Sequence, residues 1–347
     1  ASLVGGVTRC YAYTAMSKIH GGQRRLWAVR YGFGEEELLD LSTGINPNGW
    51  VVPAVPTEVW QRLPEDDGEL LKVAASYYAT DQLLPIAGSQ AAIQTLPQLR
   101  TESRVGMLPL CYSEHARGWR SAGHKVVAVA SEEIDAAVAE LDVLVIINPN
   151  NPTGERFSTA ELLSWHQQLA ERGGWLIVDE AFIDATPEHS LCAIGEARTG
   201  LIVLRSLGKF FGLAGVRAGF IFATESLRAR VEEKLGPWAF SHPAQWVTKQ
   251  VLADKDWQAQ MYKQLPLASK RLSNILTAAN LNSTGSALFQ WCELDEAVEL
   301  AERLLQERVL VRVFNATAKY RSSLRFGLPA SESEWLHLES ALKKCRV

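Results

Sequence analysis

Polar groups of four different kinds adjoin short apolar segments in the middle of the chain. Asn151 follows the run VLVIIN, Asp179 follows WLIV and Lys209 follows LIVL. Arg217 precedes the next run, AGFIF. An amide, a carboxylate, an amine and a guanidinium would therefore meet if these segments lie side by side. Such a set suits chemistry that combines a nucleophilic amine with a carboxylate and a cation that binds anions.

Each of these groups taken alone has an ordinary structural interpretation. The NPTG sequence next to Asn151 is a good turn, an aspartate after a strand often caps a helix, and a lysine in a polar loop usually faces solvent. The segment that ends at Arg217 suits a closely packed turn. Their order and spacing favour one shared site. Asp179 lies 28 residues after Asn151, Lys209 a further 30, and Arg217 a further 8.

One cofactor, pyridoxal phosphate, requires such a set of groups. Its aldehyde bonds a lysine amine as a Schiff base. Its ring nitrogen needs a carboxylate so that the ring works as an electron sink, and its phosphate needs a cation and hydroxyl groups. The motifs NNPTG (150–154), DEAF (179–182) and SLGKFFGLAGVRAG (206–219) supply them. With these motifs the chain resembles a fold-type I pyridoxal-phosphate enzyme of the class I/II aminotransferase superfamily.

The resemblance implies a role for each matching residue. Lys209 is implied as the Schiff-base lysine and Asp179 as the partner of the ring nitrogen, and these two are the catalytic candidates. The residues implied to bind the cofactor phosphate are Gly88, Ser89 and Gln90 at a helix start, together with Ser206 and Arg217. Asn151 is implied as the donor to the phenolate oxygen, and Tyr112 as the side chain stacked on the ring. An ordinary helix cap at 88–90 and a core tyrosine at 112 remain the alternatives. No metal is implied.

An amino-proximal pattern narrows the resemblance to one branch of the superfamily. HGG (20–22) is followed by LDLSTGINP (39–47), which is similar to the enzymes that decarboxylate L-threonine O-3-phosphate in cobalamin biosynthesis. The implied product is (R)-1-amino-2-propanol O-2-phosphate. Arg325 is implied on the substrate carboxylate, a planar group that suits the guanidinium fork. We expect Arg312, and second His20, on the substrate phosphate, and Asn151 also to contact substrate.

Two other functions remain open. One is an aminotransferase that acts on histidinol phosphate or a related amino acid. The other is a pyridine-nucleotide or non-enzymatic binding protein, which is disfavoured because no G-x-G-x-x-G motif follows a strand and no P-loop is present. A purely structural arm remains the alternative interpretation of HGG.

Three positions depart from the pattern that is common in aminotransferases. Phe182 replaces a tyrosine that would donate to the phenolate oxygen, so we expect Asn151 to bear that role alone. Leu63 replaces a tyrosine that in relatives reaches the cofactor phosphate of the partner subunit, so that bond is expected to be missing. Gly208 lacks the hydroxyl group that often precedes the lysine.

The elements that must position these groups follow from the hydrophobic pattern. Continuous apolar runs that alternate with helical segments predict an α/β fold with a mostly parallel sheet and a smaller α+β domain. The predicted large-domain elements are strands at 143–148, 175–178, 201–204 and 218–222, and a helix at 158–170 that begins with a capping box of Ser158 and Glu161. The last third predicts helical segments at 242–279, 295–306 and 332–344, an apolar segment at 287–294, and strands at 309–314 and 322–326.

These elements predict three parts of the chain: an amino-terminal arm (1–45) that joins the small domain, a large cofactor-binding domain (46–245) and a small carboxy-terminal domain (246–347). Fold-type I sites usually lie at a dimer interface, so the resemblance also implies a homodimer. The expected small-molecule partner is a phosphorylated amino acid.

Composition argues against several other classes of protein. The 35 Lys and Arg residues nearly balance 39 Asp and Glu residues, which leaves no strong field for nucleic acid. No apolar run approaches the roughly 18 residues of a membrane helix, and residues 1–17 lack the pattern of a signal peptide. The cysteines are odd in number and scattered, which argues against disulfides or a structural zinc site and for a reducing cytoplasm; they are Cys10, Cys111, Cys192, Cys292 and Cys345.

Overall fold

The computed structural model describes residues 20–65 and 68–345, which form two compact units. Of the described residues, unit 1 takes 20–48, 152–154 and 265–345, and unit 2 takes 49–65, 68–151 and 155–264. The division predicted at residues 45 and 245 stays a prediction. The amino-terminal segment 1–17 and Cys10, on which two expectations rest, lie outside the described residues.

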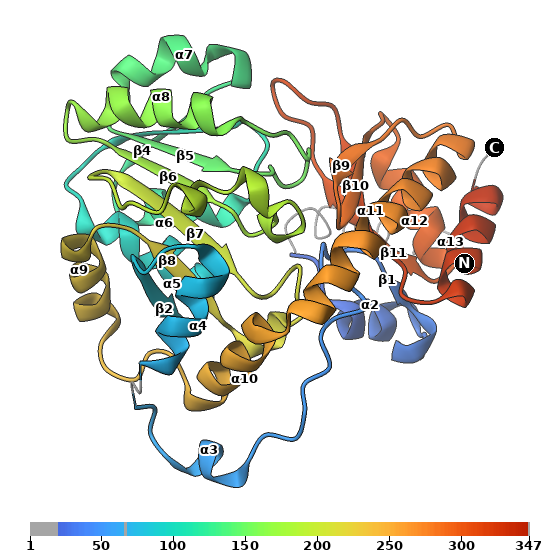
Figure 1. Cartoon of the computed structure of the whole chain (residues 1–347). Coiled ribbons are helices and arrows are strands. Elements are labelled where there is room, and N and C mark those ends of the chain that lie inside the picture. The colour runs from blue at the N-terminus through green and yellow to red at the C-terminus, as the bar shows by residue number, and fades with distance from the viewer. Residues whose placement is uncertain (1–19, 66–67, 346–347) are drawn as a thin grey trace. The chain divides into compact units, whose positions relative to one another are not determined.

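A seven-stranded sheet forms the centre of unit 2 (Figure 1). Its strand order is β2-β8-β7-β6-β5-β3-β4. The strands from β4 to β7 pair in parallel, whereas β8 is antiparallel to both of its neighbours, so the predicted mostly parallel sheet is confirmed. The strands are β2 (Leu83–Ile86), β3 (Arg104–Met107), β4 (Lys125–Ala128), β5 (Val143–Ile147), β6 (Trp175–Asp179), β7 (Leu201–Ser206) and β8 (Gly219–Phe222).

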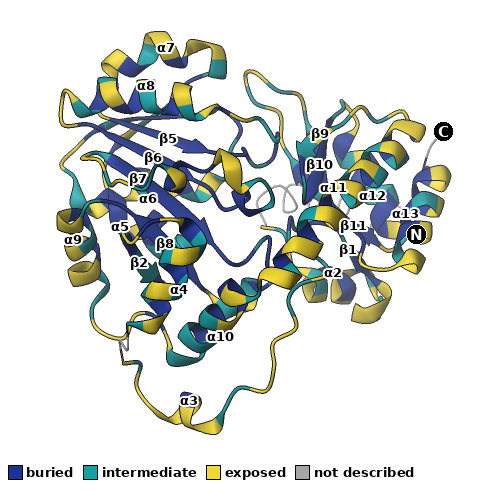
Figure 2. Ribbon diagram, viewed as in Figure 1, coloured by how far each residue is buried: buried dark blue, intermediate teal, exposed yellow. Residues whose placement is uncertain are grey.

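The central strands are apolar except at the carboxyl ends of β6 and β7, because helices cover both faces of the sheet. Every residue of β5, β6 and β7 is buried, as Figure 2 shows. The helices of unit 2 are α3 (Thr57–Gln61), α4 (Glu69–Tyr78), α5 (Ser89–Thr95), α6 (Ser113–Ser121), α7 (Ile134–Ala137), α8 (Thr159–Ala170), α9 (Glu225–Leu235) and α10 (His242–Ala253). Side chains of α5, α6 and α9 share one core with the sheet, which defines the face that we call the front face.

Local sequence signals fix two helix starts. Ser158 caps α8 by accepting a hydrogen bond from the Glu161 backbone N–H, and the Glu161 side chain accepts one from the Ser158 N–H, as the capping box predicts. The helical pattern at 242–279 forms two helices, α10 and α11 (Lys255–Ala278). Asp254 separates them, and its carboxylate accepts a hydrogen bond from the Trp257 N–H in the first turn of α11.

Unit 1 contains a four-stranded antiparallel sheet with the order β12-β13-β10-β9. A separate parallel pair joins β1 to β11. The strands are β1 (Leu39–Asp40), β9 (Thr284–Ser286), β10 (Phe289–Glu293), β11 (Val309–Leu310), β12 (Arg312–Phe314) and β13 (Ser323–Gly327), and the remaining helices are α2 (Arg24–Tyr31), α12 (Ala297–Gln306) and α13 (Glu332–Cys345).

The prediction of a single strand at 309–314 was wrong. The segment changes partners at Val311: β11 pairs in parallel with β1, and β12 pairs antiparallel with β13. A continuous apolar run specifies extended backbone but not the strand beside it, so the break depends on contacts that are distant in sequence.

No helix in the described part of the chain is long and apolar enough to cross a membrane. Among residues 20–65 and 68–345, no group of three or more His, Cys, Asp and Glu side chains is placed to hold a metal ion.

Candidate functional site

The carboxylate of Asp179 lies at the carboxyl end of β6 and is only 3% exposed. His115 of α6 approaches it, with Nε2 at 2.9 Å from the Asp179 Oδ2. The Ala181 backbone N–H donates to the other carboxylate oxygen at 3.1 Å. Since an ionised carboxylate is only an acceptor, Nε2 of His115 carries the proton in this contact. These bonds hold the Asp179 side chain in one orientation.

Two glycines allow a close approach of chain segments around Arg217. A Cβ atom on Gly88 would lie 2.9 Å from Nη2 of Arg217, and one on Gly219 would lie 3.2 Å from the backbone N of Ser89. Gly88 has φ +75° and Arg217 has φ +56°, so both residues adopt the left-handed conformation that L side chains rarely take. Arg217 and Gly219 therefore both approach the backbone at the start of α5 closely.

Ser206 is the last residue of β7 and pairs across the sheet with Gly219 of β8. Its hydroxyl oxygen accepts a hydrogen bond from the Gly208 N–H at 3.2 Å. The predicted phosphate ligands Gly88, Ser89, Ser206 and Arg217 are thus gathered at the ends of β7 and β8 and the start of α5.

Lys209 follows β7 in a tight turn, in which the Gly212 N–H donates to the Lys209 carbonyl at 3.1 Å. Its Nζ atom lies 5.4 Å from the centre of the Phe182 ring. Phe182 is buried beyond the end of β6. The amine that follows β7 therefore lies near a side chain that follows the neighbouring strand, β6. The structure therefore brings Lys209 to the segment that also carries Asp179.

Tyr112 immediately precedes α6 and contacts the start of α5. Its hydroxyl donates to the Gln90 Oε1 at 3.4 Å, and the Gln90 amide donates to Glu114 at 3.3 Å. The rings of Tyr112 and His115 meet edge to face with centroids 6.3 Å apart. Gln90 thus contributes a side chain that orients Tyr112, in addition to the predicted backbone N–H.

Asn151 lies half-buried in the turn after β5. Its neighbour Asn150 is fully buried and donates from its side chain to the Leu110 carbonyl at 2.9 Å. The Asn150 backbone N–H donates to the Glu155 carbonyl at 2.8 Å. The first asparagine of the motif therefore anchors the turn, which leaves the second, Asn151, as the candidate for ligand contact.

All predicted cofactor residues belong to unit 2, and the residues present fit pyridoxal phosphate. The observation that tests the fit is the convergence of the Arg217 guanidinium on Gly88 at the start of α5, near the strand position of Ser206. A buried carboxylate and an amine at neighbouring strand ends complete the donor set that the cofactor requires.

The predicted substrate cations belong to unit 1. Arg312 of β12 and Arg325 of β13 lie directly opposite each other in the antiparallel pair. Arg325 is 6% exposed, and its guanidinium carbon lies 5.3 Å from the centre of the Phe289 ring. Burial, and then the nearby Arg312 charge, lowers the pKa of Arg325 to about 9. Asp40 offsets part of the repulsion between the two guanidinium groups, and an anionic ligand would stabilise the pair further.

The HGG segment lies against the main chain that supports Arg325. The Ser42 carbonyl accepts from Nη2 of Arg325 at 2.7 Å, and the Ser42 hydroxyl oxygen accepts from the Gly22 N–H at 2.9 Å. A Cβ on Gly21 would lie only 2.3 Å from the Ser42 carbonyl oxygen. Glycine is therefore required at position 21 for this close approach. His20 precedes it and is exposed.

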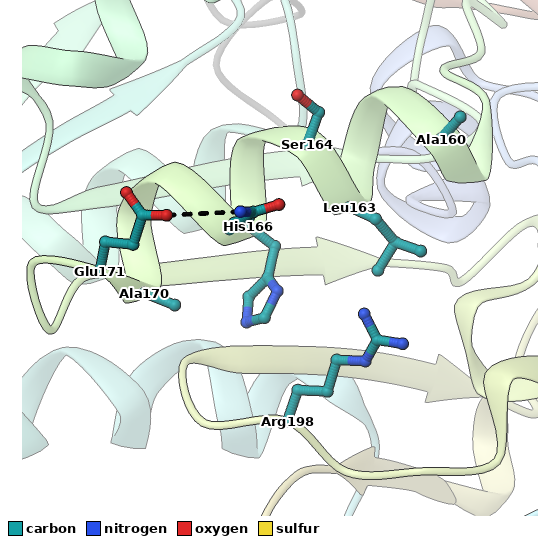
Figure 3. A pocket seen from close by; sticks show the side chains of 8 residues that line it. Ala160, Leu163, Ser164, His166, Ala170, Glu171 and Arg198 are labelled. Carbon is teal, nitrogen blue, oxygen red and sulfur yellow. Dashed lines mark hydrogen bonds between the residues drawn. The ribbon is translucent and has the colours of Figure 1, made fainter.

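The groove in Figure 3 lies apart from these residues. Its volume is about 530 Å³ and it runs along α8. His166 points toward the loop before β7 and bonds the Thr199 carbonyl at 2.9 Å. None of the predicted site residues lines it; the lining residues are Ala160, Leu163, Ser164, His166, Gln167, Ala170, Glu171 and Arg198.

Sequence reasoning missed His115 and the buried charges near Asp179. His115 follows Tyr112 by three residues, about one helical turn, and that spacing was a usable signal. Arg205 and Glu180 flank Ser206 and Asp179 in the sequence, but charged residues at strand ends are ordinarily interpreted as solvated. In the structure both are buried and paired.

The chain is similar to known proteins over most of its length. A sequence model of the family described as aminotransferase class I and II matches residues 41–338. The chain is 47% identical to a threonine-phosphate decarboxylase of Pseudomonas aeruginosa over 93% of this chain and 96% of the relative. It is 40% identical to one from Sinorhizobium sp over 95% and 98%.

One solved structure shows the same fold. It is a histidinol-phosphate aminotransferase from Sinorhizobium meliloti in complex with pyridoxal-5'-phosphate, with a TM-score of 0.83 and 20% identity over 93% of this chain and 94% of that chain.

Proposed function

Because the chain belongs to the class I and II aminotransferase family, we propose that it is a pyridoxal-phosphate-dependent carboxy-lyase that acts on L-threonine O-3-phosphate. The product is (R)-1-amino-2-propanol O-2-phosphate, an intermediate for cobalamin biosynthesis. The observation that carries this proposal is the 47% identity, over 93% of the chain, to a protein named threonine-phosphate decarboxylase. The histidinol-phosphate aminotransferase in the same fold class is only 20% identical.

Unit 2 supplies the residues that hold the cofactor. Lys209 would bind it covalently through its amine, Asp179 would keep the ring nitrogen protonated, and Arg217 and Ser206 would bind its phosphate together with backbone N–H groups at 88–90. Tyr112 would pack on the ring and Asn151 would donate to the phenolate oxygen. When bound, pyridoxal phosphate withdraws electrons and so stabilises negative charge at the substrate Cα.

The remaining chemistry belongs to side chains of this chain. Arg325 binds the α-carboxylate, while Arg312 and His20 bind the phosphate at the other end of the substrate. Holding both ends fixes the orientation of Cα, which decides whether a proton or CO₂ departs. When the bond from Cα to the carboxylate breaks, its electron pair stays at Cα. The ammonium of Lys209 then delivers a proton to that carbon.

The decisive experiment supplies purified holoenzyme with threonine phosphate and measures CO₂ and the amino alcohol phosphate. Histidinol phosphate with 2-oxoglutarate, assayed for the keto product, is the alternative reaction. We expect CO₂ from threonine phosphate and little from threonine itself, because the phosphate anchor is then missing. Keto product without CO₂ would instead assign an aminotransferase, and equal use of threonine and threonine phosphate would contradict the phosphate anchor.

We also propose that the enzyme is a cytoplasmic homodimer. The four cysteines in the described part of the chain are not disulfide-bonded, which suits a reducing compartment. Apolar side chains in and beside α3 are strongly exposed, with Trp60 at 64% and Leu63 at 61%. Large exposed apolar groups are typical of a surface that another chain covers. Leu63 has no hydroxyl group, so the cross-subunit bond to the cofactor phosphate at this position is absent in the proposed dimer.

A further inference from the structure

Arg205 lies on the face of the unit 2 sheet that is opposite to the cofactor residues. Ile177 of β6 and Ile202 and Leu204 of β7 belong to the front-face core. Side chains alternate between the two faces along a strand. Asp179 and Ser206 therefore share the front face, whereas Glu180 and Arg205, their immediate neighbours in sequence, point to the reverse face.

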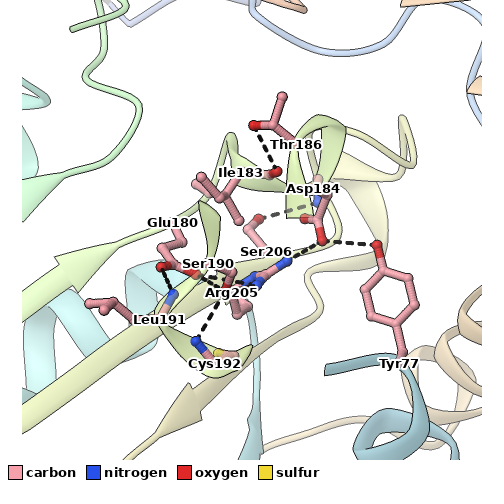
Figure 4. Close-up of polar contacts among 12 residues, drawn as sticks. Tyr77, Glu180, Ile183, Asp184, Thr186, Ser190, Leu191, Cys192, Arg205 and Ser206 are labelled. Carbon is pink, nitrogen blue, oxygen red and sulfur yellow. Dashed lines mark hydrogen bonds and ion pairs between the residues drawn. The ribbon is translucent and has the colours of Figure 1, made fainter. Parts of the chain in front are cut away.

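Arg205 joins two carboxylates on this reverse face (Figure 4). Its Nη1 lies 3.2 Å from the Glu180 Oε2, and its Nη2 bonds the Asp184 Oδ1. Nη1 also donates to the Ser190 hydroxyl oxygen at 2.7 Å, and the Tyr77 hydroxyl donates to Asp184 at 3.0 Å. We call Glu180, Asp184 and Arg205 the reverse-face clamp.

The clamp is buried completely. Arg205 is 2% exposed, and Glu180 and Asp184 are 0% exposed. Burial would lower the pKa of Arg205, but Asp184 and Glu180 raise it well above the ordinary value, so the guanidinium stays charged. One cation faces two carboxylates. Removing such charges from water costs several kcal/mol for each ion, and apolar replacements are often equally stable. Stability alone therefore does not explain the clamp.

We propose that the reverse-face clamp positions Asp179 and Ser206 for cofactor binding. The planar fork of Arg205 reaches both Glu180, which directly follows Asp179, and Asp184 in the next 3-10 helix (Ile183–Ala185). Arg205 itself directly precedes Ser206. The clamp thus joins the carboxyl ends of β6 and β7 on the reverse face of the sheet. On the front face, Asp179, the ring-nitrogen partner, and Ser206, a phosphate ligand, therefore keep a constant separation. This proposal rests on the assignment of Asp179 and Ser206 to the cofactor.

Arg205→Lys keeps the charge but cannot form the fork, so it tests the clamp in the holoenzyme. The measurements are the cofactor dissociation constant, the pH midpoint of the visible absorption band and the ³¹P shift of the bound cofactor. We expect about tenfold weaker cofactor binding, as if one charged hydrogen bond to the cofactor were lost when Asp179 or Ser206 is displaced, together with a displaced midpoint and ³¹P shift. The matched control, Arg271→Lys, alters the exposed forked pair with Glu332 in unit 1 and should leave all three unchanged.

A second variant separates positioning from stability. The triple variant Glu180→Leu, Asp184→Leu, Arg205→Met removes all three charges together, so no unpaired charge remains buried. We expect it to fold with near-wild-type thermal stability and still to bind the cofactor about tenfold more weakly. Wild-type cofactor binding, absorption midpoint and ³¹P shift in either folded variant would overturn the proposal. Failure of the triple variant to fold would also overturn it, because the clamp would then serve the stability of unit 2.

Asp179→Asn and Ser206→Ala, measured in parallel, separate this proposal from the proposed function. If these two variants alter the absorption midpoint and the ³¹P shift while the clamp variants do not, the clamp proposal fails alone. If none of them alters either measurement, the assignment of Asp179 and Ser206 to the cofactor fails as well.

Discussion

Lys209 bears the most specific expectation at the scale of single residues. In Lys209→Ala we expect no catalysis and a cofactor that is bound only noncovalently, because the amine that bonds it is absent. Borohydride reduction of the holoenzyme followed by peptide mapping should label Lys209. Lys234→Ala, on the exposed face of α9, serves as the control and should keep full labelling and activity. A label on another lysine in the wild type would contradict the assignment.

Substitutions at Asp179 and at His115 should lower activity to different degrees. Asp179→Asn should lower activity by several orders of magnitude while the fold is kept, because an amide cannot stabilise a protonated ring nitrogen as a carboxylate does. His115→Phe keeps a ring but has no N–H donor, so it removes the 2.9 Å hydrogen bond to the buried carboxylate; this should cost about 1.5–3 kcal/mol, or roughly tenfold to a hundredfold in kcat. The pH midpoint of the visible band should shift in both variants. Turnover near the wild-type rate in Asp179→Asn would refute the electron-sink role.

Arg312 carries the prediction for substrate specificity. Arg312→Ala should raise KM for threonine phosphate about tenfold to a hundredfold, because a charged hydrogen bond to the phosphate is lost, and lower kcat if that anchor orients the carboxylate. Threonine without phosphate should show little further loss. Arg321→Ala is the matched control, since Arg321 pairs with exposed Asp295. Equal effects of Arg312→Ala on both substrates would assign Arg312 a structural role instead.

The same pair of arginines predicts a dependence on pH. Arg325 has a pKa lowered to about 9, so it loses its proton, and with it affinity for the carboxylate, as the pH rises through that value. KM for threonine phosphate should therefore increase above about pH 9. Removal of the like charge in Arg312→Ala raises the pKa of Arg325, which should move this increase to higher pH.

At the scale of elements, the HGG segment should act through backbone packing. Gly21→Ala places a Cβ 2.3 Å from the Ser42 carbonyl oxygen, the acceptor of the Arg325 hydrogen bond. The displaced carbonyl should weaken binding of the substrate carboxylate and raise KM without altering the cofactor spectrum. In the control, Gly34→Ala, the added Cβ meets only the side-chain ends of Glu36 and Glu37. A normal KM in Gly21→Ala would show that the segment does not support Arg325.

Elements that depend on local signals were predictable from the sequence, whereas those that depend on distant partners were not. The capping box of Ser158 and Glu161 correctly marked the start of α8 because both residues belong to one helical turn. The break at Val311 escaped prediction because β1, the partner of the residues before it, is 270 positions away in the sequence (Leu39 with Val309), although β13, the partner of the residues after it, is close. The positions of Asp179 and Lys209 at strand ends were predictable for the same reason as the start of α8. Each residue is next to its strand in the sequence, so a local pattern is enough to place it.

The candidate site shows the same limit. Gly88 and Arg217 are 129 positions apart, and their approach follows from the pairing of β2 with β8, which no local pattern specifies. Only the resemblance to a family of known chemistry connected them in advance. His115 meets Asp179 across 64 positions, and Arg205 meets Glu180 from a neighbouring strand. Such pairs of charged side chains can be identified only once the order of the strands in the sheet is known.

At the scale of the whole molecule, the exposed apolar surface in and beside α3 predicts the state of assembly. We expect light scattering to give about twice the chain mass of 38.3 kDa for the wild type. Trp60→Glu introduces a charge where 64% of the tryptophan is exposed, and burying it in an interface would be costly. This variant should therefore shift toward monomer on dilution, with loss of activity. Leu336→Glu, an equally drastic change at a 56% exposed leucine of α13, should leave the mass unchanged. A fully active wild-type monomer would contradict the proposed dimer, whereas a dimer that Trp60→Glu does not weaken would place the interface on another surface.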